Sequence, residues 1–189
     1  APTEDWQQER ARVLAQARVV VVKVGSAVLT DANGLSMPVL ENLAAQLAEL
    51  RNLMPESSAG VEGGTQPRRL VLVSSGAVAA GRAALFSRGH VVETTGLAAR
   101  QAAAAVGQGQ LMQAWDKVFL AHRMPTAQVL LTRDDLRARQ RFLNARNTFA
   151  ELLEWAVLPI VNENDTVSIS ELKFGDNDCL ASLLVNLTG

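Results

Sequence analysis

Short runs of apolar residues alternate along the chain with longer segments of helical periodicity. Four valines fill positions 19–22, and a second apolar run fills 70–73. Unbroken apolarity over this length is typical of strands that are buried on both faces, as in a parallel sheet. The runs at 129–131 and 157–161 predict two more strands, although Pro159 weakens the last one because proline cannot donate to a sheet ladder.

The segments between these runs predict helices. Ser36 suits a helix N-cap with Pro38 in the first turn, and leucines follow at helical spacing. Further helices are predicted over 77–86, 97–106, 110–123 and 142–155. We interpret Gly107-Gln108-Gly109 as a break between two of them. Strands that alternate with helices of this length predict βαβ units, and hence an α/β fold: a three-layer α/β/α sandwich with a mainly parallel sheet.

Composition narrows the class of protein. The 189 residues suit one domain, and a hydrophobic content of 48% excludes wholesale disorder. The formal net charge of −1 argues against a general surface for nucleic acid or acidic membranes. No apolar stretch approaches the roughly 20 residues that cross a bilayer, and positions 1–12 do not resemble a signal peptide. The single cysteine, Cys179, cannot form an internal disulfide, and we expect it to be a small buried helix residue. We therefore expect a cytoplasmic protein with no nucleic-acid or membrane partner.

A lysine lies at the end of the first predicted strand, followed by Val-Gly-Ser. Open α/β sheets bind ligands beyond the carboxyl ends of their strands. Gly25 would let a backbone N–H approach a phosphate, and Lys23 would add a positive charge. The alternative is an edge lysine that extends into solvent before a turn.

Residues 74–76 (Ser-Ser-Gly) follow the second predicted strand and precede a helix. Free N–H groups and the helix dipole make such a corner suitable for an anion. The pattern imitates a P-loop, but Arg82 occupies the position of the P-loop lysine, so this is not a Walker A site. A glycine triplet after the first strand is absent, which disfavours NAD. The alternative is a serine cap, with Gly81 allowing close helix packing.

Acids and amides are densest at residues 162–165 (Asn-Glu-Asn-Asp) and 175–178 (Gly-Asp-Asn-Asp). Such clusters could hold an ammonium group, a metal or a lysine. A helix N-cap needs only one such residue, so three in a row exceed what capping requires. A carboxylate 4 Å from Lys23 would attract it by about 4 kcal/mol at an effective dielectric near 20.

Several stretches match one known family in order, from about Arg18 to the last residue. They are VKVGSAVLT at 22–30, VSSGAVAAG at 73–81, AAVGQ at 104–108, LTR at 131–133, FLNAR at 142–146, IVNEND at 160–165 and GDND at 175–178. With these motifs the chain resembles the glutamate 5-kinases of the amino acid kinase superfamily. Relatives acting on acetylglutamate or aspartate would carry Gly-Gly in place of Gly25-Ser26. The resemblance implies a kinase domain over 18–189, comprising its N-terminal amino-acid-binding portion, after an extension at 1–17.

The resemblance also implies a reaction: ATP-dependent phosphorylation of the γ-carboxylate of L-glutamate to L-glutamyl 5-phosphate, the first step of proline biosynthesis. It implies that Lys23 contacts the phosphates and stabilises the transferred group, and that Asp178 orients Lys23. Ser75, Asp165 and Asn177 correspond to glutamate-binding positions. These roles suit phosphoryl transfer, which needs positioning and charge neutralisation more than covalent chemistry.

Further phosphate contacts are predicted at Gly25, Ser26 and Gly76, with ATP and Mg²⁺ as cofactors and no metal ligand from this chain. The resemblance implies a homo-oligomer, with proline as a feedback inhibitor. Family members continue well beyond this length into a nucleotide-binding half, so the chain looks like a truncated form with little turnover alone. The segment at 55–69 is expected to be an inserted surface loop. Two alternatives stay open: another amino acid kinase, such as an acetylglutamate kinase, or a non-catalytic sensor of glutamate or proline.

Overall fold

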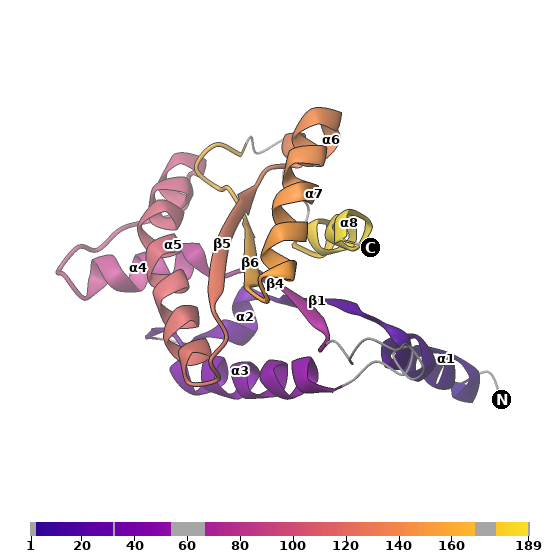
Figure 1. The fold of residues 1–189 in the computed structure, drawn as a ribbon. Helices are drawn as coiled ribbons and strands as arrows, with labels where there is room; N and C mark the ends of the chain where they lie inside the picture. Colours follow the sequence, from indigo (N-terminus) through magenta and orange to yellow (C-terminus); the bar gives the residue numbers. More distant parts are fainter. Residues whose placement is uncertain (1–2, 32, 54–66, 169–176, 189) are drawn as a thin grey trace.

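A parallel sheet forms the centre of the molecule (Figure 1). The structure, a computed structural model, describes residues 3–31, 33–53, 67–168 and 177–188. Within these ranges the sheet has four strands in the order β1-β4-β6-β5, all parallel. They are β1 (Val19–Val24), β4 (Arg69–Ser74), β5 (Thr126–Leu131) and β6 (Leu158–Glu163). Three of them contain a predicted apolar run, and β6 contains all of the run at 157–161 except Val157, so the four strands are confirmed.

Helices cover both faces of this sheet. The longer ones are α1 (Thr3–Gln16), α3 (Met37–Asn52), α4 (Ala77–Phe86), α5 (Leu97–Leu120), α7 (Arg139–Glu154) and α8 (Asn177–Thr188). Two short helices, α2 (Ser26–Leu29) and α6 (Arg133–Arg137), and a small hairpin of β2 (Thr30–Asp31) with β3 (Gly34–Leu35) complete the described elements. None of the described helices is both long and apolar enough to span a membrane.

The core lies in two clusters, one on each side of the sheet. Leu70 and Leu72 of β4 pack with α3 and α5, whereas Val71 and Val73 pack with α7 and α8. Successive strand residues point to opposite faces, so an unbroken apolar run is needed when both faces are covered. Figure 1 shows α3 and α5 on one side of the strands and α7 and α8 on the other. The predicted three-layer α/β/α sandwich is confirmed.

Pro159 lies inside β6, although proline is rare in inner strands. The N–H of Leu158 donates to Pro125 on the β5 side, so the position of the missing Pro159 N–H faces β4. Pairing of β6 with β4 begins only at Ile160, opposite Leu72. The strand therefore tolerates proline because no ladder bond is required at that point.

The predicted helix break at Gly107-Gln108-Gly109 is wrong, because α5 runs unbroken through it. A Cβ on Gly107 would lie 1.8 Å from the carbonyl oxygen of Ala77, and one on Gly81 would lie 1.8 Å from that of Ala103. The two glycines let the backbones of α4 and α5 touch where they cross. Close packing, the alternative given for Gly81, is the reason for glycine at both positions.

One prediction of burial is wrong. Cys179 is exposed rather than buried, because Leu180, Leu184 and Leu187 form the buried face of α8. Within the expected extension at 1–17, residues Thr3–Gln16 form α1, a helix with no predicted role that projects from the rest of the molecule (Figure 1). Most of the expected loop at 55–69 lies outside the described residues, and its last residue belongs to β4.

Candidate functional site

The carboxyl ends of the strands bring the predicted corners to one edge of the sheet. Val24 at the end of β1 pairs with Ser74 at the end of β4, and Val73 pairs with Val161 in β6. The N–H of Ser75 donates to the carbonyl of Val24 at 3.1 Å, which joins the corners after β1 and β4. Segments far apart in the sequence therefore share one edge, as the α/β pattern predicts.

Lys23 forms an ion pair with Asp178, 2.9 Å from Nζ to Oδ1. The lysine side chain is 27% exposed and the aspartate side chain 66%. A Cβ added at Gly25 would lie 3.6 Å from Lys23 Nζ, so the ammonium group lies over the Gly25 backbone. Lys23 therefore does not extend freely into solvent: it is turned towards the corner and held by an acid from α8.

A chain of side-chain amides links Ser75 to the interior. Asn177 donates through Nδ2 to Ser75 Oγ and, at 3.4 Å, to Asn162 Oδ1. Asn162 donates through its own Nδ2 to Gln108 Oε1 at 3.0 Å. The backbone N–H of Glu163 donates to Asn162 Oδ1 at 2.9 Å. A backbone N–H can only donate, so it fixes which end of the Asn162 amide is oxygen, and the direction of the other bonds follows.

The first two described residues of α8 thus reach two different strands. Asn177 contacts the corner after β4, and Asp178 contacts the lysine of β1. This single helix start holds Lys23 and Ser75 in one arrangement. The predicted pairing of Lys23 with Asp178 is present, as is the juxtaposition of Ser75 with Asn177. Gly175 and Asp176, which precede them, lie outside the described residues.

The predicted phosphate-contact residues lie at the same edge. Gly76 is the N-cap of α4, is buried and has φ 110°, a left-handed conformation that favours glycine. A Cβ added there would lie 3.9 Å from Thr30 and 4.0 Å from Leu29, so the β4–α4 corner packs on the segment after β1. Gly25 is the N-cap of α2, and Ser26 is its exposed first residue.

Asp165 lies in the turn that follows β6, and it is half-buried. Its N–H donates to the carbonyl of Glu163 at 3.0 Å, and the N–H of Asn164 donates to Leu131 at the end of β5 at 2.9 Å. The buried Glu163 accepts a hydrogen bond from Ser168 Oγ, which closes the turn. Asp165 therefore belongs to the same edge of the sheet as the other predicted positions.

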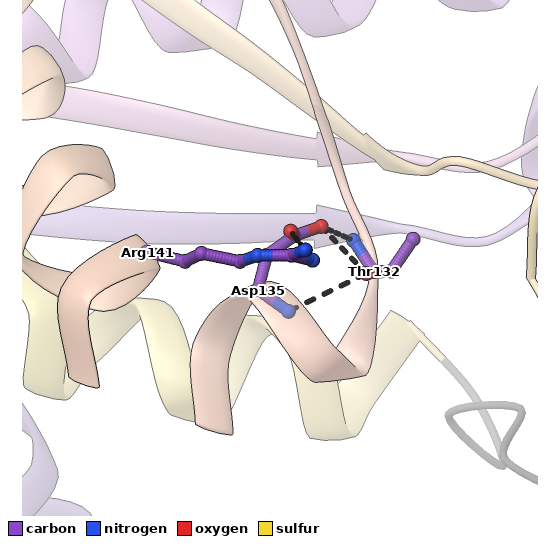
Figure 2. A network of polar contacts seen from close by, with 3 residues as sticks. All are labelled: Thr132, Asp135 and Arg141. Carbon is purple, nitrogen blue, oxygen red and sulfur yellow. Dashed lines mark hydrogen bonds and ion pairs between the residues drawn. The ribbon is translucent and has the colours of Figure 1, made fainter. Parts of the chain in front are cut away.

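A second polar network lies beside this turn, at the end of β5 (Figure 2). Thr132 caps α6: its N–H donates to Asp135 Oδ2 at 2.7 Å, and its hydroxyl accepts from Asp135 N at 3.4 Å. Arg141 Nη1 donates to Asp135 Oδ1 at 3.1 Å. Partial burial pushes the pKa of Asp135 upward, but the hydrogen bonds from Thr132 and the charge and hydrogen bond of Arg141 outweigh it, so the pKa lies below the usual value.

Sequence reasoning missed this network and the glutamines of α5. Thr132 and Asp135 have the spacing of a capping box, with aspartate in place of glutamate, and that spacing could have revealed them. Gln108 lies within the AAVGQ stretch, but its neighbouring glycines suggested only a helix break. Nothing in the local pattern indicates that it reaches Asn162.

The described residues do not build a metal site of their own. Among them, no group of three or more histidine, cysteine, aspartate or glutamate side chains lies close enough to hold an ion. The arrangement offers a cation, an acid that holds it, and a set of hydroxyl, amide and carboxylate groups beside it. Such a set suits binding and charge neutralisation of an anionic ligand.

Comparison with known proteins agrees with this geometry. Residues 18–189 match the sequence model of the Amino acid kinase family. The chain is 57% identical over 183 residues to "Glutamate 5-kinase" of Nitratidesulfovibrio vulgaris (strain Hildenborough) and 56% identical over 183 residues to that of Oleidesulfovibrio alaskensis. Both alignments cover 97% of this chain but 44% of the relative, so the chain spans less than half the length of these curated relatives. Because the family match covers every corner described above, the chain belongs to the amino acid kinase family.

Proposed function

We propose that this chain forms the amino-acid-binding part of an enzyme that transfers the γ-phosphoryl group of ATP to the γ-carboxylate of L-glutamate. The product would be L-glutamyl 5-phosphate, the first intermediate of proline biosynthesis. The observation that carries the proposal is the start of α8, where Asn177 binds Ser75 and Asp178 binds Lys23. The identity to proteins named "Glutamate 5-kinase" supports glutamate as the acceptor.

Lys23 is the proposed catalytic cation. Phosphoryl transfer spreads negative charge over the equatorial oxygens of the transferred group, and a fixed positive charge stabilises that state. The ion pair with Asp178 at 2.9 Å holds the ammonium group in place over Gly25. Lys23 moves no proton in this scheme. Its contribution is charge at a fixed point, with Asp178 as the residue that positions it.

Ser75 and Asn177 have the polarity that an amino acid requires. Because Ser75 Oγ accepts from Asn177, its own proton is left to donate, and within the described residues it bonds to no protein acceptor. That proton suits the α-carboxylate of the substrate. Asn177 Oδ1 can accept from the α-ammonium group, and Asp165 adds a negative charge at the same edge. Donor and acceptor are thus matched to the two charged groups of glutamate.

ATP would lie against the residues that follow β1 and β4. Backbone N–H groups near Gly25, Ser26 and Gly76, together with Lys23, fit phosphate oxygens. Magnesium neutralises phosphate charge when it is bound with ATP. The described residues offer no carboxylate cluster for it, so we assign it no protein ligand here.

The wider setting is also proposed. We assign residues 18–189 to the kinase domain, with 1–17 as an extension that precedes it. The complete protein would be a cytoplasmic homo-oligomer, with proline as its feedback inhibitor. The family match from residue 18 onward supports the start of the domain. The location, the oligomer and the inhibition by proline rest on the family resemblance alone.

The test uses the complete protein with ATP, Mg²⁺ and three acceptors: glutamate, N-acetylglutamate and aspartate. Release of ADP and trapping of the acyl phosphate by hydroxylamine measure turnover, and we expect glutamate to be the preferred acceptor. Preference for another acceptor would make the protein a different amino acid kinase. Calorimetric binding of glutamate or proline without turnover would make it a sensor.

A further inference from the structure

We infer that Gln108 is a positioning residue of this site. Helix α5 sets the geometry of the substrate corner through two glutamines: Gln108 accepts a hydrogen bond there and Gln101 donates one. The inference rests on the proposed function and adds residues that the reaction itself does not require. Neither glutamine contacts Lys23 or Asp178 through any bond described above. Both contact the strand end and turn that carry the substrate-binding groups.

Gln108 acts as an acceptor. Its Oε1 accepts from Asn162 Nδ2 at 3.0 Å, and Asn162 is 4% exposed. The other end of the Asn162 amide accepts from the N–H of Glu163 and from Asn177. The backbone N–H of Glu163 therefore fixes Asn162 Nδ2 as the donor towards Gln108. Only a hydrogen-bond acceptor at position 108 satisfies that donor.

Gln101 acts as a donor. Its Nε2 donates to the carbonyl of Ser168 at 3.0 Å, and a carbonyl can only accept. Positions 101 and 108 are two turns apart on α5, so their side chains share one face of the helix. Gln108 fixes the end of β6 at Asn162, and Gln101 fixes the far end of the turn that contains Asp165.

The consequence of losing Gln108 passes along the amide chain. Without an acceptor, the buried Nδ2 of Asn162 has no protein partner among the bonds described, and a buried unsatisfied donor is costly. Rotation of the Asn162 amide to find another partner would break its bond from Glu163 or from Asn177. Asn177 then holds Ser75 less firmly, so glutamate binding weakens while the Lys23–Asp178 pair remains.

The decisive experiment replaces each of the two glutamines, in the complete protein, once by methionine and once by glutamic acid. The KM for the substrate glutamate is then measured for each variant. Gln108→Met removes the acceptor, and we expect the KM for glutamate to rise about tenfold, with kcat and the KM for ATP within about twofold of the parent. Gln108→Glu keeps an acceptor oxygen and should restore the KM to within about threefold. At position 101 the order differs: Gln101→Glu places a carboxylate against the Ser168 carbonyl and should weaken glutamate binding at least as much as Gln101→Met.

Gln113→Met is the matched control, because Gln113 is exposed on the same helix. Melting temperatures of all variants report any general loss of stability. An unchanged glutamate KM in Gln108→Met, an equal change in Gln113→Met, or a failure of Gln108→Glu to rescue would each overturn the inference. If the parent does not phosphorylate glutamate, the proposed function fails. The inference on Gln108 is then tested by calorimetric affinity for glutamate, which should be weakened in Gln108→Met and close to that of the parent in Gln108→Glu and Gln113→Met. A parent that does not bind glutamate overturns both.

Discussion

Two acid–base pairs lie at the carboxyl edge of the sheet, and they are built in opposite ways. Lys23 meets Asp178 from a distant part of the sequence, whereas Asp135 meets Arg141 six residues further on. In the first pair the cation is the more enclosed partner, with a side chain 27% exposed against 66% for the acid. In the second the acid is the more enclosed partner, at 28% against 64%.

The less exposed residue of each pair is turned in a different direction, and that direction indicates the role of the pair. Lys23 is turned into the corner where several strands end, and Asp178 fixes it there. Asp135 is turned back onto Thr132, so its bonds close the first turn of α6 (Figure 2). We propose that the first pair positions a charge for a ligand, whereas the second stabilises a local turn. Substitutions in the first should change the rate, and substitutions in the second should change stability.

The largest effect is expected from Lys23→Ala in the complete protein. Loss of the charge that stabilises the transferred phosphoryl group should lower kcat for glutamate phosphorylation by about 10²–10³. Glutamate affinity by calorimetry and the melting temperature should stay close to those of the parent, because Ser75 and Asn177 remain. Lys117→Ala, on the exposed surface of α5, is the control. An unchanged kcat would remove Lys23 from the mechanism.

Asp178→Asn should have a smaller effect of the same kind. The amide can still contact the ammonium of Lys23, but it no longer supplies the opposite charge that keeps Lys23 fixed. We expect kcat to fall about tenfold, with the KM for glutamate changed less than in Gln108→Met. Steady-state kinetics with both substrates measure this split. A loss of stability without a loss of rate would assign Asp178 to the same structural class as Asp135.

The contrast between the pairs also explains what sequence could predict. The apolar runs of β1 and β4 are local patterns, and their ends mark where ligands bind in an α/β sheet, so Lys23 and Ser75 could be placed at one edge. The order β1-β4-β6-β5 depends on which strands pair across long separations, and no local pattern records that. The contact of Asp178 with Lys23 was expected from family resemblance and charge rather than from spacing.

The failures have the same origin. A glycine is a helix breaker by its own propensity, yet Gly107 lies within α5 because Gly81 of another helix packs against it. Residue type predicts a buried Cys179, but its position on α8 relative to Leu180 leaves it exposed. Local pattern does not predict the role of Gln108, because its partner, Asn162, is distant in sequence. Tertiary contacts determine the conformation at Gly107, the exposure of Cys179 and the hydrogen bond of Gln108.

In the second pair, Asp135→Asn should lower stability rather than rate. The substitution removes the negative charge of the carboxylate that accepts hydrogen bonds from Thr132 and Arg141. Loss of such a cap lowers the free energy of unfolding by about 1–2 kcal/mol. The free energy of unfolding from urea titration should fall by that amount at pH 7, with kcat close to the parent value. Asp134→Asn is the control, since Asp134 is exposed in the same turn. A large fall in kcat at unchanged stability would contradict the division between the pairs.

The smallest effect is the pH dependence of that stability difference. The pKa of Asp135 is lower in the folded protein than in the unfolded chain, because the bonds from Thr132 and Arg141 outweigh the effect of burial. A lowered folded pKa gives stability that is present above the unfolded value of about 4 and is lost as the pH falls through the folded value. The difference in unfolding free energy between parent and Asp135→Asn should therefore be constant from pH 7 to about 5 and shrink below about 4. Because asparagine does not titrate, a difference that persists undiminished at pH 3 would mean that shape, rather than charge, accounts for the contribution of Asp135.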